Sequence, residues 1–161
     1  MINSGIINGI PVHSSYKILT DLLRNRLGFE GVILTDWEDI NKLHDRDKIV
    51  SSKKEAIRLA INAGIDMSMV PYEYEEFIDK LIELVNEGKV TMDRIDEAVS
   101  KILKLKFELD LFENPSTSPS DYNDFASEEF QGMAYQSAAE SITLLKNNDN
   151  ILPLERDKKI L

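Results

Sequence analysis

The chain has 161 residues, no cysteine and a formal net charge of −10, from 19 Lys and Arg against 29 Asp and Glu. A composition of 42% hydrophobic and 30% charged residues is typical of a soluble globular protein with enough apolar side chains for a core, which excludes wholesale disorder. The acidic excess and the lack of a basic cluster exclude nucleic acid as an expected partner.

The missing cysteine also excludes a disulfide framework and every thiolate metal site. Residues 1–15 carry neither a basic opening nor an apolar stretch long enough for a signal peptide, and no apolar run approaches the ~20 residues needed to span a bilayer. We therefore expect a soluble chain with no membrane partner. No compartment and no oligomeric state are predicted.

The first half of the chain predicts helices that alternate with short buried strands. Met1 to Pro11 predicts a strand end and a turn, and Gly28 and Gly64 are expected to end helices. A polar loop is expected between Asp36 and Ser52, where Ser52-Lys53-Lys54-Glu55 predicts a capping box. This alternation with short connections is typical of parallel βα architecture. The expected elements are a helix with Ser14 or Ser15 as N-cap that runs to about Leu27, a strand at Gly31 to Thr35, a helix from Ser52 to Gly64 and a strand at Ile65 to Val70.

Two further amphipathic helices are expected at Glu73 to Glu87 and at Thr91 to about Leu109, and each needs a surface to cover. The strongest linker signal is Asn114 to Asp124, with two prolines among serines and aspartates. Beyond it, Ser127 predicts the start of a helix to about Lys146, and Lys158 to Leu161 resembles the start of a strand. Because the chain opens in a strand end and closes in a strand start, we expect a fragment of a larger fold.

Asp36 is the main candidate for chemistry, because it directly follows the buried run Val32-Ile33-Leu34. Catalytic groups of parallel α/β folds gather at the carboxyl ends of strands. The only tryptophan, Trp37, is the next residue and offers a flat apolar face on which a sugar ring could stack. A loop-ordering aspartate beside a core tryptophan is the alternative interpretation.

Seven stretches in a fixed order carry a specific family resemblance that covers nearly the whole chain. They are Asn8 to Pro11, Leu19 to Arg24, Leu27 to Trp37, Ala63 to Met67, Gly88 to Leu111, Ala139 to Asn147 and Ile151 to Leu154. Together they resemble glycoside hydrolase family 3, which includes β-glucosidases and β-xylosidases.

The resemblance implies an α/β fold in which an N-terminal (β/α)8 TIM-type barrel precedes an α/β sandwich domain. Residues 1–113 resemble the C-terminal part of the barrel, residues 114–126 a linker, and residues 127–161 the start of the second domain with its first helix. As a fragment the chain would be rich in helix. Asp36 falls on the family's catalytic nucleophile at the end of the seventh barrel strand, and Trp37 on the neighbour that shapes the sugar subsite.

The implied reaction is the retaining hydrolysis of terminal β-D-glycosides, with a β-glucoside or oligosaccharide as substrate and no cofactor. A retaining enzyme needs a second carboxylic acid ~5–5.5 Å from the nucleophile, which the resemblance places outside this chain. We therefore expect the fragment alone to be inactive. The alternative function is a non-catalytic helical interaction module that keeps the family's sequence.

The remaining polar candidates have structural explanations. Asp66, inside the second strand, is expected to be a buried carboxylate bonded to neighbouring backbone, and His13 a satisfied structural histidine. A calcium loop at Asp36 to Asp47 is rejected, because Ile40 and Asn41 stand where an oxygen ligand and a glycine are needed, so no metal site is predicted. A solvated acidic loop is expected for Glu38, Asp39, His44, Asp45 and Asp47.

Overall fold

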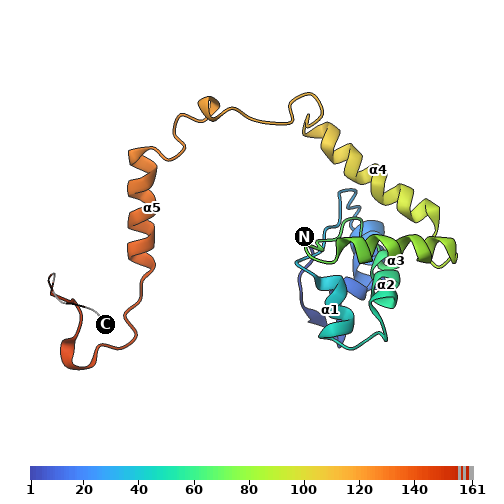
Figure 1. The fold of residues 1–161 in the computed structure, drawn as a ribbon, viewed down its shortest axis with the longest axis horizontal. Coiled ribbons are helices and arrows are strands. Elements are labelled where there is room, and N and C mark those ends of the chain that lie inside the picture. Colours follow the sequence, from blue (N-terminus) through green and yellow to red (C-terminus); the bar gives the residue numbers. More distant parts are fainter. Residues whose placement is uncertain (156, 158, 160–161) are drawn as a thin grey trace. The chain divides into compact units, whose positions relative to one another are not determined.

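The structure is a computed structural model that describes residues 1–155, 157 and 159 (Figure 1). The chain forms two compact units, Met1–Pro115 and Ser116–Leu161, which are described separately. Most of the strand expected at Lys158 to Leu161 lies outside the described residues.

Helices make up most of the first unit (Figure 1). Its hydrophobic core lies between the helices and the extended segments, and its centre is α2, which buries Ile57 and Ala60. The elements in chain order are the antiparallel strands β1 (Ile6–Ile7) and β2 (Ile10–Pro11), a 3-10 turn (Val12–Ser14), a π-helix (Lys17–Arg26), α1 (Asp39–Asp45), α2 (Lys53–Ala63), α3 (Tyr74–Asn86) and α4 (Met92–Glu108).

The first expected helix is present but differs in its start and its winding. It is a π-helix that begins at Lys17 without a side-chain cap, so the prediction that a serine caps it is wrong. The Ser14 hydroxyl instead donates to the carbonyl of Pro11 at 2.8 Å. The end is as expected, because Gly28 adopts φ +70° and its N–H donates to the carbonyl of Arg24 at 3.0 Å.

The two expected strands pair in parallel, but they are much shorter than predicted. Only Leu34 and Met67 form a bridge, and the Thr35 N–H donates to the Met67 carbonyl at 3.1 Å. Side chains interrupt the ladder on both sides of this bridge. The Ile33 N–H donates to Asp66 Oδ2 at 2.9 Å, and the Met69 N–H donates to Thr35 Oγ1 at 2.8 Å, where backbone carbonyls would continue a sheet.

The segment after Trp37 was expected to be a loop, and this prediction is wrong because it contains α1. The helix buries Ile40 and Leu43, which lie three residues apart on one face. Glu38 precedes it with φ +56°, and its N–H donates to the Met69 carbonyl at 2.9 Å. Only seven residues are helical, so the apolar pattern is too short to stand out in the sequence.

The side-chain caps of the next helices are present, but the capping box expected at Ser52 to Glu55 is only half formed, because the Glu55 carboxylate accepts from Arg58 instead. The Ser52 side chain accepts the Glu55 N–H at the start of α2, and Thr91 accepts the Arg94 N–H at the start of α4. Gly64 ends α2 with φ +116°, and a Cβ at this position would collide with Thr20 Oγ1. Glycine is therefore required where α2 meets the π-helix.

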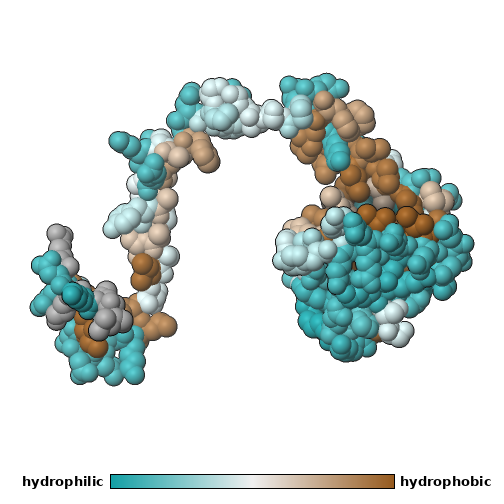
Figure 2. All heavy atoms as spheres, viewed as in Figure 1, coloured by the Kyte–Doolittle hydropathy of each residue, from teal (hydrophilic) through white to brown (hydrophobic). Residues whose placement is uncertain are grey.

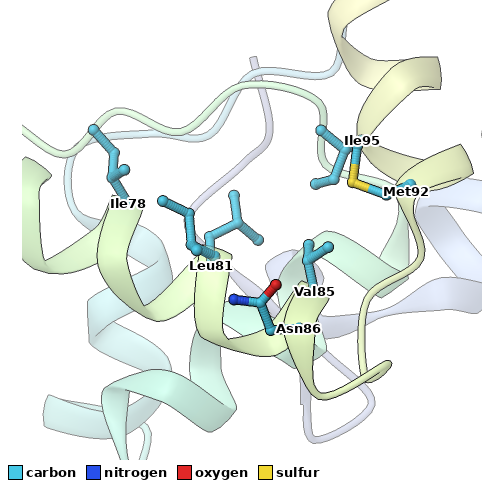
Figure 3. A pocket seen from close by; sticks show the side chains of 7 residues that line it. Ile78, Leu81, Val85, Asn86, Met92 and Ile95 are labelled. Atoms are coloured by element: carbon cyan, nitrogen blue, oxygen red, sulfur yellow. The ribbon is translucent and has the colours of Figure 1, made fainter.

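Helices α3 and α4 bury few of their apolar side chains completely and leave many of them half-buried or exposed. Leu84 is the only buried residue of α3, and Ala98 is the only one of α4. Figure 2 shows hydrophobic surface along α4 and near its junction with α3, and a hydrophilic surface below them. The two helices form an open cavity of about 390 Å³, lined by Ile78, Leu81, Ile82, Val85, Asn86, Met92 and Ile95 (Figure 3).

The second unit contains a 3-10 turn (Pro119–Asp121), α5 (Glu128–Ser141) and a further 3-10 turn (Asn148–Asn150). Ser127 caps α5 as expected, but the helix ends at Ser141 and does not reach Lys146. The end coincides with the β-branched pair Ile142 and Thr143, and Ile142 is extended. Across the described part of both units, no helix is long and apolar enough to cross a membrane.

Candidate active site

Asp36 stands directly after the extended segment that contains the parallel bridge, and it is half-buried. Its Oδ1 atom accepts the N–H of Trp37 at 2.7 Å. Its carbonyl accepts the N–H of Asp39 at 3.4 Å, at the first turn of α1. The carboxylate is therefore partly open to solvent, while one of its oxygens and the Asp36 carbonyl each accept a backbone N–H.

His13 is the side chain that holds the other backbone group of Asp36. The ring is buried, and its Nε2 atom accepts the Asp36 N–H at 3.3 Å. Burial lowers the pKa of His13 below its ordinary value of 6.5, against the opposing charges of Asp39 and Asp36. The ring is therefore neutral near pH 7, as an acceptor nitrogen requires. The expected structural role is confirmed, and its partner is Asp36 itself.

The burial of Asp39 shows that the expectation of a solvated acidic loop is wrong for this residue. Its side chain is 1% exposed, Oδ1 accepts from Lys42 Nζ at 2.6 Å, and Oδ2 lies 3.4 Å from His13 Nδ1. Burial acts to raise the pKa of Asp39, but hydrogen bonds from Lys42 and Ser4 and the neighbouring positive charges outweigh it and lower the pKa. Asp39 stays ionised and cannot supply a proton to a leaving group.

Two other acids of this segment are also engaged by basic side chains. Asp45 Oδ1 lies 2.8 Å from His44 Nδ1, and Asp47 Oδ1 accepts from Arg46 Nε at 2.7 Å. Within the described residues, no group of three or more acidic or histidine side chains converges to hold a metal ion. Asp36 and Glu38 are the acids of this segment that form no ion pair among the described residues, and of these two Asp36 directly follows the extended segment with the bridge.

Trp37 forms an aromatic pair with Tyr72. Their ring centroids are 6.1 Å apart, and the rings meet edge to face at 79°. Trp37 is 49% and Tyr72 72% exposed, so both rings are open to a ligand. Sequence reasoning missed Tyr72, because it lies 35 residues from Trp37 and only the pairing of the two extended segments brings the rings together.

Asp66 is confirmed as a buried carboxylate bonded to backbone, and it also joins two helices to the bridge. Its fully buried side chain accepts the Ile33 N–H and hydrogen bonds from Arg24 and Arg94. Arg94 also donates to the carbonyl of Ile65 at 2.7 Å. The segment that ends at Asp36 is thus fixed three residues upstream by a buried ionic network.

The site lies apart from the apolar cavity of α3 and α4, whose lining includes neither Asp36 nor Trp37. That cavity presents almost only aliphatic side chains, with Asn86 as its polar member (Figure 3). Chemistry on a sugar needs a carboxylate, so Asp36 and not the cavity marks the candidate active site.

The model of the glycosyl hydrolase family 3 N-terminal domain matches residues 2–105. The chain belongs to glycosyl hydrolase family 3. The match includes Asp36, His13, Tyr72 and every element of the first unit up to most of α4.

Relatives of family 3 match nearly the whole chain. The lysosomal β-glucosidase of Dictyostelium discoideum is 48% identical over 156 residues, which are 96% of this chain and 19% of that protein. A β-xylosidase of Formosa agariphila is 33% identical, over 94% of this chain and 22% of that protein. The β-glucosidase of Listeria innocua in complex with gluconolactone aligns with a TM-score of 0.72 and 31% identity, over 92% of this chain and 20% of its own. The chain therefore spans about a fifth of the length of these relatives.

Proposed function

We propose that the chain supplies the nucleophile half of a retaining β-glycosidase active site, with Asp36 as the nucleophile and Trp37 in the sugar subsite. The observation that carries the proposal is the half-buried Asp36 carboxylate, which lies at the end of a bridged segment between a buried histidine and an exposed aromatic pair. Membership of family 3 supports the same reaction class.

The proposed reaction has two displacements. A carboxylate oxygen of Asp36 bonds to the anomeric carbon while the glycosidic bond breaks, and a second carboxylic acid protonates the departing oxygen. Water deprotonated by that second group then attacks the anomeric carbon, releases the sugar with retained configuration and restores Asp36. Asp39, Asp45 and Asp47 are paired with basic side chains. We assign the second acid to a segment outside these 161 residues, as the resemblance to family 3 implies.

Terminal β-D-glycosides are the proposed substrates. The relatives include a β-glucosidase and a β-xylosidase, and the Listeria structure holds gluconolactone. An exposed indole beside a carboxylate suits the apolar face of a pyranose ring, which supports a glucoside or a short oligosaccharide.

The proposed architecture assigns residues 1–113 to the C-terminal part of a (β/α)8 barrel, residues 114–126 to a linker and residues 127–161 to the start of an α/β sandwich domain. The parallel bridge between Leu34 and Met67 and the exposed apolar faces of α3 and α4 support this assignment. Neighbouring barrel elements would cover those faces and pair with the extended segments.

A chimera tests the function. This chain replaces the matching segment of the Dictyostelium lysosomal β-glucosidase, to which it is 48% identical. Asp36→Gly is expected to lower turnover of an aryl β-glucoside by roughly 10³- to 10⁶-fold, and added azide is expected to restore part of it as a glycosyl azide. Asp45→Gly, on the exposed side of α1, is the control and should keep turnover. Full activity of the Asp36→Gly chimera would remove Asp36 from the mechanism.

The 161-residue chain alone is expected to release no nitrophenol from the same substrate, because the proposal places the acid partner of Asp36 in another segment. Steady release by the purified chain would contradict the proposal that the second acid lies outside these 161 residues. A chimera that folds but is inactive even with Asp36 intact would favour the non-catalytic interaction module.

A further inference from the structure

We propose that His13 is a positioning residue for the Asp36 nucleophile and that Asp39 holds the His13 ring in the required tautomer. The inference rests on the proposed function. It concerns two buried side chains whose residues contact the backbone of Asp36.

The hydrogen bond to Asp36 determines the tautomer. The Asp36 backbone N–H can only donate, so His13 Nε2, 3.3 Å away, must be the nitrogen without a proton. The ring proton of neutral His13 is then on Nδ1, which lies 3.4 Å from Asp39 Oδ2, a buried oxygen with no hydrogen-bond partner among the described residues. Lys42 donates to the other oxygen of Asp39 at 2.6 Å, and this bond fixes which carboxylate oxygen lies towards the ring.

This arrangement fixes the peptide groups on both sides of Asp36. His13 accepts the Asp36 N–H, and the carbonyl of Asp36 accepts the N–H of Asp39. The Trp37 N–H donates to Oδ1 of the carboxylate and orients it. Catalytic groups must be held within about 0.5 Å of their productive position, and the supporting residues achieve this through such locked contacts.

Protonation of the ring would remove the acceptor. A proton on Nε2 would point at the Asp36 N–H, and two donors cannot bond to each other. The charged groups that face the ring are Asp36, Asp39, Lys42 and Arg46, and burial of the ring acts against the two carboxylates. The site therefore keeps a neutral histidine with a defined proton position, as a fixed acceptor for the nucleophile's backbone needs.

The test uses the chimera and an activated 2-deoxy-2-fluoro-β-glucoside with dinitrophenolate as leaving group. A carboxylate oxygen of Asp36 bonds to the anomeric carbon, and the leaving group departs with the electron pair of the broken bond. No proton is transferred, so the rate constant of inactivation reports the attack by Asp36 without the general acid. Mass spectrometry of the labelled peptide identifies the attacked residue.

Asp39→Asn is the decisive variant because it keeps the shape of the side chain. Lys42 still donates to the amide oxygen, so the amide NH2 faces His13 Nδ1 and forces the ring proton onto Nε2. The inactivation rate constant is expected to fall about 10²-fold, the cost of a misplaced reacting group, while the binding constant of the reagent stays within about twofold.

His13→Gln and His13→Phe form the second pair. The glutamine oxygen can accept the Asp36 N–H and its NH2 can donate to Asp39, so the rate constant is expected to stay within about threefold of the parent. Phenylalanine fills the same space without an acceptor and is expected to be about 10²-fold slower. His44→Gln and Asp45→Asn, on the exposed side of α1, are the matched controls and should match the parent.

Two results would overturn the positioning role. One is an Asp39→Asn chimera that is inactivated at the parent rate, and the other is a glutamine variant as slow as the phenylalanine variant. If His13→Phe does not fold, as judged by thermal melting, the Asp39→Asn and His13→Gln results still decide. Failure to label Asp36 in the parent chimera would instead overturn the proposed function.

Discussion

Helices α2 and α5 begin with the same kind of cap but differ in how many of their side chains are buried. Each begins after a serine whose hydroxyl accepts the N–H three residues on, at 3.2 Å in both cases. Helix α2 then buries five apolar side chains between α1, α3 and the π-helix, whereas no residue of α5 is buried. A cap therefore specifies where a helix begins, whereas the burial of the helix depends on which other helices pack against it.

The polar groups of the two regions also differ in burial. Around the parallel bridge, Asp66, Asp39 and Thr35 are buried and each is held by named hydrogen bonds or ion pairs. The bonds of α5, such as Gln136 to Glu140, are exposed. Buried polar contacts are costly to break, because the group that remains loses both its partner and water. We expect substitutions near the bridge to cost far more than matched substitutions in the second unit.

The largest loss is expected from Asp66→Ala. Arg24 and Arg94 would keep their charges at 11% and 12% side-chain exposure without the carboxylate between them. Breaking a buried pair in this way costs about 3–5 kcal/mol of unfolding free energy. Urea unfolding of the chain, followed by fluorescence of its only tryptophan, measures the change. Asp96→Ala, on the exposed side of α4, is the control, and equal losses for both variants would contradict the comparison.

A matched pair of leucines tests the apolar side of the comparison. Leu43 in α1 is 1% exposed, and Leu145 after α5 is 91% exposed. Leu43→Ala is expected to lower the unfolding free energy by about 2–5 kcal/mol, because it leaves a cavity in the core. Leu145→Ala should change it by less than about 0.5 kcal/mol. A Leu145→Ala loss as large as that of Leu43→Ala would mean that the second unit has a core of its own.

Removal of the two serine caps gives a smaller and more local contrast. Ser52→Ala is expected to cost about 1 kcal/mol in the cooperative unfolding of the first unit. Ser127→Ala should lower the helix signal in circular dichroism without moving the urea midpoint, because no residue of α5 is buried. The comparison would fail if the two variants moved the midpoint equally.

Several helix caps and helix ends were predicted correctly, because they depend on residues within about one helical turn of each other. Ser52, Thr91 and Ser127 cap their helices as expected, and Gly28 and Gly64 end theirs. The strand lengths were not predictable in this way. Asp66 and Thr35 replace backbone acceptors at two positions of the ladder, and only the folded chain brings them there.

The same limit applies to the candidate site. Asp36 and Trp37 were identified because they directly follow an apolar run, which is a local pattern, and their roles stay predictions. The link between His13 and Asp36 spans 23 residues, and the contact of Trp37 with Tyr72 spans two extended segments. Asp39 looked solvated because its neighbours are charged, yet α1 turns it into the interior.

The smallest expected effect is the pH dependence of stability between about 7.5 and 5.5, where histidines titrate. Burial lowers the pKa of His13 in the folded chain below 6.5, so the unfolded chain binds more protons in this window. The unfolding free energy should therefore fall as the pH falls through 6.5. Urea midpoints should show this slope in the parent and in His44→Gln, and His13→Gln should flatten it. A His13→Gln variant with the parent slope would show that protonation of this buried ring does not oppose folding, and that the acceptor behind Asp36 is not held in its neutral form by burial.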